Sequence, residues 1–151
     1  MAQLKLRRAR PRDANALADL HMKTRRESLP FLPQIHNGAQ TRSWMRDFVL
    51  PSYNVLVVEV RDAIAGYIAL DGEIVDQLYV LPEYQHRGIG TCLLEKARQL
   101  SPHRLTLWCF QKNAVARAFY EKHGFVAVQF TDGTRNEEHE PDLLYRWEAP
   151  R

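Results

Sequence analysis

Six consecutive residues near the middle of the chain have the types and the spacing of an anion-binding turn. They are Gln85, His86, Arg87, Gly88, Ile89 and Gly90, and they lie between a predicted strand and a predicted helix. A tight glycine turn that opens a helix points several backbone N–H groups at one position, with the positive end of the helix dipole behind them. The sequence therefore predicts a phosphate cradle at this turn.

The length and composition bound the kind of protein that carries this turn. The chain has 151 residues, of which 45% are hydrophobic, so we expect one domain over residues 1–151. The net charge is only +3 and the basic residues are scattered, so no nucleic-acid partner is expected. No signal peptide is expected from the first residues, and no apolar run approaches the ~20 residues that span a bilayer. We therefore expect a cytoplasmic protein with no membrane partner.

The two cysteines, Cys92 and Cys109, fall in or beside apolar stretches and are far from a paired metal-ligand or redox spacing. The histidines show no zinc spacing either. We expect buried free thiols and no metal site.

Alternation of apolar and polar residues predicts most of the strands, and helical spacing predicts the segments between them. The predicted order is mixed α/β, without an internal repeat. The predicted strands cover residues 4–7, 53–60, 64–70, 74–81, 104–110, 125–130 and 143–147.

Four helices are predicted from capping residues and apolar stripes. Asp13 can cap the first, which carries Leu17, Leu20 and Thr24 and stops before Pro30. A short second helix holds residues 44–49 and ends at Pro51, and the third covers residues 88–100. The fourth is capped by Asn113 and ends at Gly124, with a predicted apolar face formed by Ala114, Val115, Ala118 and Phe119.

Three segments taken together resemble the GNAT superfamily of acyl-CoA-dependent N-acetyltransferases. They are Leu78-Tyr79-Val80 followed by Pro82, then the six residues of the glycine turn, then Asn113 through Phe119-Tyr120-Glu121-Lys122-His123-Gly124-Phe125. The resemblance implies an α/β (α+β) fold with a mixed, mostly antiparallel sheet of about six to seven strands, flanked by about four helices and splayed at the fourth and fifth strands. It also implies direct transfer of an acetyl group from acetyl-CoA to a primary amine of a small molecule or peptide in a ternary complex.

The resemblance assigns roles in cofactor binding to residues of these segments. The N–H groups of residues 85–90 would hold the pyrophosphate of CoA, with added charge from Arg87. The main chain of Leu78, Tyr79 and Val80 would pair with pantetheine amides. Asn113, which can also simply cap its helix, and Phe119 complete the cofactor-binding set. The alternative is that Gly88 and Gly90 only permit close helix packing.

Tyr120 is the candidate acid, because its place in the motif resembles the family tyrosine whose hydroxyl approaches the thioester sulfur. It is predicted to lie off the apolar face of its helix, and a surface tyrosine is the alternative. Glu73 and Asp76 are the candidate bases. Asp76 shares a strand face with Leu78, so burial is expected to raise its pKa. A turn carboxylate and a strand-edge salt bridge are the alternatives, and an exposed amine needs no base.

The acceptor amine would be framed by residues 27–36 and 131–142. The second segment is acidic and could attract a cationic amine, although a solvated loop is the alternative. Direct attack is favoured over an acyl-enzyme on Cys92 or Cys109, because no histidine motif would activate either thiol. A silent acyl-CoA-binding sensor and a protein-interaction module remain alternatives to an enzyme, and a monomer or a homodimer is expected.

Overall fold

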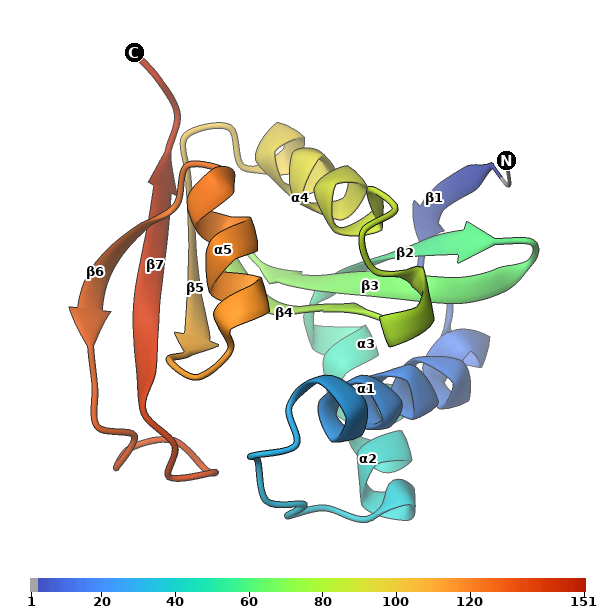
Figure 1. Cartoon of the computed structure of the whole chain (residues 1–151). Helices are drawn as coiled ribbons and strands as arrows, with labels where there is room; N and C mark the ends of the chain where they lie inside the picture. Colours follow the sequence, from blue (N-terminus) through green and yellow to red (C-terminus); the bar gives the residue numbers. More distant parts are fainter. Residues whose placement is uncertain (1–2) are drawn as a thin grey trace.

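The computed structural model describes residues 3–151 and contains one seven-stranded sheet (Figure 1). The order across the sheet is β1-β2-β3-β4-β5-β7-β6, and every neighbouring pair is antiparallel except β4 with β5. This confirms the predicted mixed, mostly antiparallel sheet. The strands are β1 (Leu4–Arg8), β2 (Asn54–Val60), β3 (Ala63–Asp71), β4 (Ile74–Val80), β5 (Arg104–Phe110), β6 (Val126–Phe130) and β7 (Asp142–Glu148).

Helices cover the two faces of the sheet in separate groups (Figure 1). On one face lie α1 (Ala14–Ser28), α2 (Gly38–Trp44), a π-helical turn (Met45–Val49) and α3 (Leu50–Ser52). On the other face lie α4 (Ile89–Leu100) and α5 (Ala114–Lys122). Short 3-10 turns at Pro11–Asp13 and Pro82–Tyr84 precede α1 and follow β4.

The central strands divide the apolar side chains between two cores. On β3, Tyr67 and Ala69 are fully buried against α1, whereas Ile68 is fully buried on the α4 side. Successive residues of a strand point to opposite faces, so a strand covered on both sides must be apolar throughout. Each large aliphatic side chain buried in this way contributes about 1.5–3 kcal/mol to stability.

The helix before β2 runs past Pro51 instead of ending at it. Proline lacks the N–H that would bond to the carbonyl four residues back. The chain adapts by a π-helical turn, in which the Leu50 N–H donates to the Met45 carbonyl, and the helix ends at Ser52. The sequence predicted a helix over residues 44–49 ending at Pro51, so it missed the first six residues of this helical segment, which begins at Gly38, and its last residue, Ser52.

Strands β4 and β5 pair through their main chains only near their beginnings. Ile74 is in register with Thr106, and the Thr106 N–H donates to the Glu73 carbonyl at 2.9 Å. No other main-chain ladder pair joins the two strands within the described part of the chain. Their carboxyl ends diverge, which confirms the predicted splay between the fourth and fifth strands.

The predicted apolar face of α5 was wrong for three of its four residues. Ala114 and Ala118 are exposed and Val115 is 62% exposed, whereas Tyr120 is only 8% exposed and Ala116 packs against the core. The side of α5 that carries Val115 and Ala118 lines a cleft between β4 and β5. An apolar stripe on a helix beside a cleft therefore does not identify the side that faces the core.

A network of ion pairs and hydrogen bonds links β1 to the start of α1. The Arg7 guanidinium lies 2.8 Å from Asp13 Oδ2 and 2.8 Å from Glu59 Oε1, and the Arg10 N–H also donates to Asp13 at 2.7 Å. The hydrogen bond from Arg7 holds the pKa of Asp13 below its usual range, against an opposing effect of burial. All three side chains are largely shielded from solvent.

Replacing Asp13 with Asn is expected to lower the free energy of unfolding by about 2 kcal/mol at pH 7, because it leaves Arg7 without one of its counter-charges. The pKa of Asp13 is lower in the folded than in the unfolded chain, so its stabilisation is present above pH ~4 and is lost as pH falls through the folded pKa. Denaturant unfolding should show the difference between wild type and Asp13→Asn shrinking between about pH 5 and pH 2.

The control is Asp47→Asn, which removes an exposed carboxylate that pairs only with its neighbour Arg46. This substitution should leave stability nearly unchanged at every pH. A constant difference between wild type and Asp13→Asn from pH 7 to pH 2 would contradict the linkage.

Candidate active site

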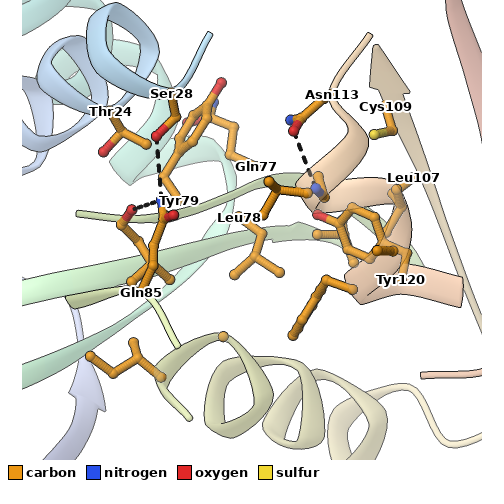
Figure 2. A pocket seen from close by; sticks show the side chains of 18 of the residues that line it. Thr24, Ser28, Gln77, Leu78, Tyr79, Gln85, Leu107, Cys109, Asn113 and Tyr120 are labelled. Atoms are coloured by element: carbon orange, nitrogen blue, oxygen red, sulfur yellow. Dashed lines mark hydrogen bonds between the residues drawn. The ribbon is translucent and has the colours of Figure 1, made fainter. Parts of the chain in front are cut away.

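The divergence of β4 and β5 opens a cleft of about 880 Å³ (Figure 2). Its walls come from the end of α1, from β4 and β5, from the turn before α4 and from α5. Glu73 and Arg87 do not line it, whereas the other predicted site residues do. Those lining residues are Asp76, Leu78, Tyr79, Val80, Gln85, His86, Gly88, Ile89, Gly90, Asn113, Phe119 and Tyr120.

The main chain of β4 offers hydrogen-bonding groups to the cleft at alternate residues. The Leu81 N–H donates to the Ala65 carbonyl of the β3 side, and Tyr79, two residues earlier, is in register with Tyr67 of β3. Peptide groups of alternate residues point to opposite edges of a strand, so those of Leu78 and Val80 point toward β5. Tyr79 differs from the prediction, because its main chain points to β3 and only its side chain reaches the cleft.

The turn before α4 presents free amide groups at the end of the same cleft. Gly88 adopts φ +82°, and α4 follows it without a side-chain cap. The first helical hydrogen bond runs from the Cys92 N–H to the Gly88 carbonyl at 2.9 Å, which leaves the N–H groups of Ile89, Gly90 and Thr91 without a helical acceptor. Such a helix terminus attracts an anion.

The two glycines of the turn are required for different reasons. A Cβ at Gly90 would lie 3.2 Å from Phe119 Cζ, so this glycine permits the close approach of α4 and α5. A Cβ at Gly88 would have no heavy atom within 4 Å, so packing does not explain this residue. Close packing therefore explains Gly90. Gly88 is instead required by its positive φ, which glycine adopts without strain, and it borders open space in the cleft.

Side chains of the turn tie it to neighbouring elements. Gln85 Nε2 donates to the Val80 carbonyl at 3.1 Å and to Ser28 Oγ at 3.3 Å, which joins the end of β4 to α1 (Figure 2). The Arg87 guanidinium stacks over the Tyr84 ring at 5.4 Å and is exposed. It therefore adds positive charge beside the turn without lining the cleft.

Tyr120 lies in the α5 wall, on the opposite side of Leu78 from Thr24 and Ser28 (Figure 2). The prediction that it lies off the buried face was wrong, since its ring packs against Phe125 and Tyr145. Burial raises the pKa of its hydroxyl well above 10. The hydroxyl therefore remains protonated at neutral pH. Asn113 Oδ1 caps α5 by accepting from the Ala116 N–H at 3.2 Å.

The two predicted bases occupy different environments. Asp76 is the extra residue of a bulge, because Gln77 opposes Ala69 and Val75 opposes Leu70. It is exposed, so the predicted burial is wrong, but it lines the cleft and accepts a hydrogen bond from Gln77 Nε2 at 3.0 Å. Glu73 lies in the exposed turn before β4, outside the cleft.

A buried polar network behind β4 was missed by the sequence analysis. His21 Nδ1 lies 2.9 Å from the Tyr67 hydroxyl, and Tyr67 in turn donates to Gln77. Burial, reinforced by Arg25, lowers the pKa of His21 to about 3, so the ring is neutral at pH 7. This network fixes the side chain that contacts Asp76. Its only sequence signal was the presence of polar residues at core positions of β3, β4 and α1.

Thr24 also lines the cleft, and the sequence analysis did not place it in the site. It is 3% exposed, and its hydroxyl has no hydrogen-bond partner in the described part of the chain. It lies on the α1 wall of the cleft (Figure 2).

Three carboxylates of the acidic segment 131–142 contact basic side chains from other parts of the protein. Glu138 pairs with Arg25 at 3.0 Å, Glu140 with Lys112 at 3.0 Å, and Glu137 with His36. These contacts join the loop to α1, to the turn after β5 and to the loop after α1. Two of the five carboxylates of the segment, Glu138 and Glu140, are paired with permanent cations, which reduces but does not remove the negative charge that the segment presents to a cationic amine.

Both cysteines are free thiols, but Cys92 is partly exposed, so the prediction that both are buried is correct for Cys109 alone. Cys109 is buried in the cleft wall, and burial raises its pKa to about 12, so it is not a ready nucleophile at pH 7. Within residues 3–151 no cluster of metal-ligating side chains is found, and no helix has the length and apolar character to cross a bilayer.

Comparison with known proteins identifies the class to which this fold and cleft belong. Residues 51–127 match the family model of the acetyltransferase (GNAT) domain. The chain belongs to the GNAT acetyltransferase family, and it is an acetyl-CoA-dependent N-acetyltransferase.

Individual relatives extend this comparison beyond the matched domain. The peptidyl-lysine N-acetyltransferase YjaB of Salmonella typhimurium is 29% identical over 81% of this chain and 83% of its own. The solution structure of apo YjaB from Escherichia coli superposes with a TM-score of 0.80 at 24% identity, covering 98% of this chain and 99% of that one. The PaiA N-acetyltransferase of Thermoplasma acidophilum, solved with coenzyme A, has a TM-score of 0.73 at 18% identity and covers 97% and 99%.

Replacing Gly88 with Asn is expected to raise the Kd for acetyl-CoA at least about tenfold, equivalent to 1.4 kcal/mol. Asn tolerates a positive φ, so the thermal unfolding temperature should change little, while its side chain occupies the space in front of the free amide groups. Isothermal titration calorimetry measures the affinity.

The matched control is Gly72→Asn, at another glycine with positive φ and open space around it, in the β3–β4 turn outside the cleft. It should bind acetyl-CoA like wild type. Equal affinities for both variants would refute an anion site at the turn.

Proposed function

We propose that this enzyme acetylates lysine side chains of polypeptides by direct transfer from acetyl-CoA. The observation that carries the proposal is the open edge of β4, where the peptide groups of Leu78 and Val80 point into a cleft that ends at the free amides of α4. The choice of lysine is supported by the relative from Salmonella typhimurium, which is named a peptidyl-lysine N-acetyltransferase.

In this proposal the chain binds the cosubstrate through its main chain. Leu78 and the Val80 N–H pair with the pantetheine amides, while the Val80 carbonyl stays bonded to Gln85. The N–H groups of Ile89, Gly90 and Thr91 hold the pyrophosphate, assisted by the dipole of α4. Val115 and Phe119 supply apolar contacts along the α5 wall.

Tyr120 acts as the general acid in this proposal. A neutral amine attacks the thioester carbon, a C–N bond forms and the C–S bond breaks, and Tyr120 gives its proton to the departing thiolate. Its raised pKa keeps it in the donating form over the whole working range of pH. The burial of its ring fixes the direction of the hydroxyl.

The proton lost by the amine goes to Asp76 or directly to water. Of the two carboxylates named from the sequence, only Asp76 lines the cleft, so no role is proposed for Glu73. Direct attack is supported over an acyl-enzyme because the pKa of Cys109 is raised to about 12 by burial. At pH 7 that thiol is almost entirely protonated and a poor nucleophile.

Replacing Tyr120 with Phe is expected to lower kcat by about 10² to 10⁴, because it removes the proton donor but keeps the packed ring. The Kd for acetyl-CoA should change little. In wild type, kcat should show no alkaline loss caused by Tyr120 up to pH ~9.5, since burial raises its pKa above the usual value of about 10.

Tyr53→Phe serves as the control, because it removes a hydroxyl from a tyrosine outside the cleft. It should keep wild-type kcat. Full turnover by Tyr120→Phe would remove this residue from the mechanism.

The proposed acceptor is tested by a panel of amines with acetyl-CoA, read as thiol release and by mass spectrometry. Lysine-containing peptides and Nα-acetyl-lysine amide should be acetylated on Nε, with higher kcat/KM than spermidine or a peptide N terminus. Acetylation of spermidine alone would overturn the choice of lysine but not the acetyl transfer.

A further inference from the structure

One face of the β5-β7-β6 part of the sheet is left uncovered. The helices α1, α2 and α3 lie against β2–β4, and α5 covers the opposite face of β5 and β7 (Figure 1). Strand register places two rows of side chains on the uncovered side, since the alternate residues Leu105, Leu107, Leu143 and Tyr145 are buried in the core. We call this surface the open face; its rows are Trp108–Leu144–Gln129 and Thr106–Arg146–Val126.

The open face carries large apolar side chains in contact with solvent. Trp108 is 50% exposed and Val126 is 64% exposed, with partly buried Leu144 in the row of Trp108. Exposed tryptophan is unusual on a surface without a partner and is enriched among the residues that dominate protein interfaces.

Trp108 connects the open face to the cleft. It lines the cleft together with Phe110, two residues further along β5, on the side of the sheet where Thr24 and Ser28 form the opposite wall. A bound polypeptide that enters the cleft from this side of the sheet therefore contacts Trp108 and continues directly onto the open face.

The open face also has a surplus of positive charge. Arg104 Nη2 and Arg146 Nη1 both approach the same carboxylate oxygen of Glu148, at 3.6 and 3.9 Å. One carboxylate cannot neutralise two guanidinium groups, so one positive charge remains available beside Val126 and Leu144. A ligand with a negative charge complements this surface.

We propose that the open face docks the polypeptide that carries the acceptor lysine, with an apolar residue of that polypeptide on Trp108 and Val126 and an acidic residue against Arg146. This inference rests on the proposed lysine acetylation and adds to it a preference for the flanking sequence. A second copy of this chain is a poorer occupant, because a subunit seated on Trp108 would also cover the entrance to the cleft.

The geometry sets the spacing between the two recognised residues. Trp108 and Arg146 are diagonal neighbours on adjacent strands, about 7–8 Å apart at Cα. An extended peptide advances about 3.3 Å per residue. The acidic residue should therefore stand about two positions beyond the apolar residue that contacts Trp108, which is three positions from the acceptor lysine when the apolar residue is next to that lysine.

The test compares three substrates with wild type and with Arg146→Glu. Two are peptides with the same single lysine, with either Glu or Arg three positions away, and the third is Nα-acetyl-lysine amide, which cannot reach the open face. Wild type should prefer the Glu peptide in kcat/KM by about fivefold, and Arg146→Glu should reverse this preference. Both enzymes should acetylate the amide equally.

The control is Arg8→Glu, which makes the same change of charge at an exposed residue of β1, at the opposite edge of the sheet. It should keep the wild-type preference. The docking proposal is overturned if neither variant alters the ratio between the peptides while all three substrates react, a result that leaves lysine acetylation intact. It is also overturned if sedimentation shows a wild-type dimer that Arg146→Glu dissociates, since a second copy then occupies the face.

Failure of the proposed function gives a different result. In that case wild type binds acetyl-CoA but acetylates neither the peptides nor the amide, and both the choice of lysine and the docking surface are overturned together.

Discussion

The architecture of the site depends on the single point at which β4 and β5 are joined. The pairing of Ile74 with Thr106 anchors two parallel strands at their beginnings, and their carboxyl ends are left free to separate. Main-chain groups at an interior strand edge normally have partners, because burying them unpaired is costly. The open edge of β4 is therefore a surface that a ligand with amide groups completes, and an enzyme that uses acetyl-CoA supplies such a ligand.

Different elements around this opening form different parts of the site. The crossover from β4 to β5 contains α4, so the helix that makes the parallel connection also ends the cleft with free N–H groups. On the other wall, α5 positions Tyr120 with its ring in the core and its hydroxyl toward the cleft. Behind β4, the bonds from His21 through Tyr67 to Gln77 hold the bulge at Asp76. In the proposed function the cleft thus has a cosubstrate side near α4 and an acceptor side near α1, Trp108 and the open face.

Local patterns were sufficient to predict most of this fold. Alternation and capping predicted the strands and the four helices, and the motif from Gln85 to Gly90 predicted the turn that opens α4. The helix that runs past Pro51 was an error of backbone geometry, whereas the errors at the site share one origin, which is that an apolar or polar pattern does not say what a surface faces. Val115 and Ala118 face the cleft, Asp76 lies on a bulge that breaks strand alternation, and two carboxylates of the acidic loop are paired with cations distant in sequence. The different reasons for Gly88 and Gly90 likewise depend on contacts with α5.

The measurement that tests the account most directly is a titration of ¹⁵N-labelled protein with coenzyme A, followed by backbone amide chemical shifts. The largest changes are expected at the N–H groups of Leu78, Val80, Ile89, Gly90 and Thr91, with Tyr79 less affected and β1 and β6 unchanged. Saturable binding that leaves Leu78 and Val80 unperturbed would contradict the central claim, because the open edge of β4 would then not be the surface that the cosubstrate completes.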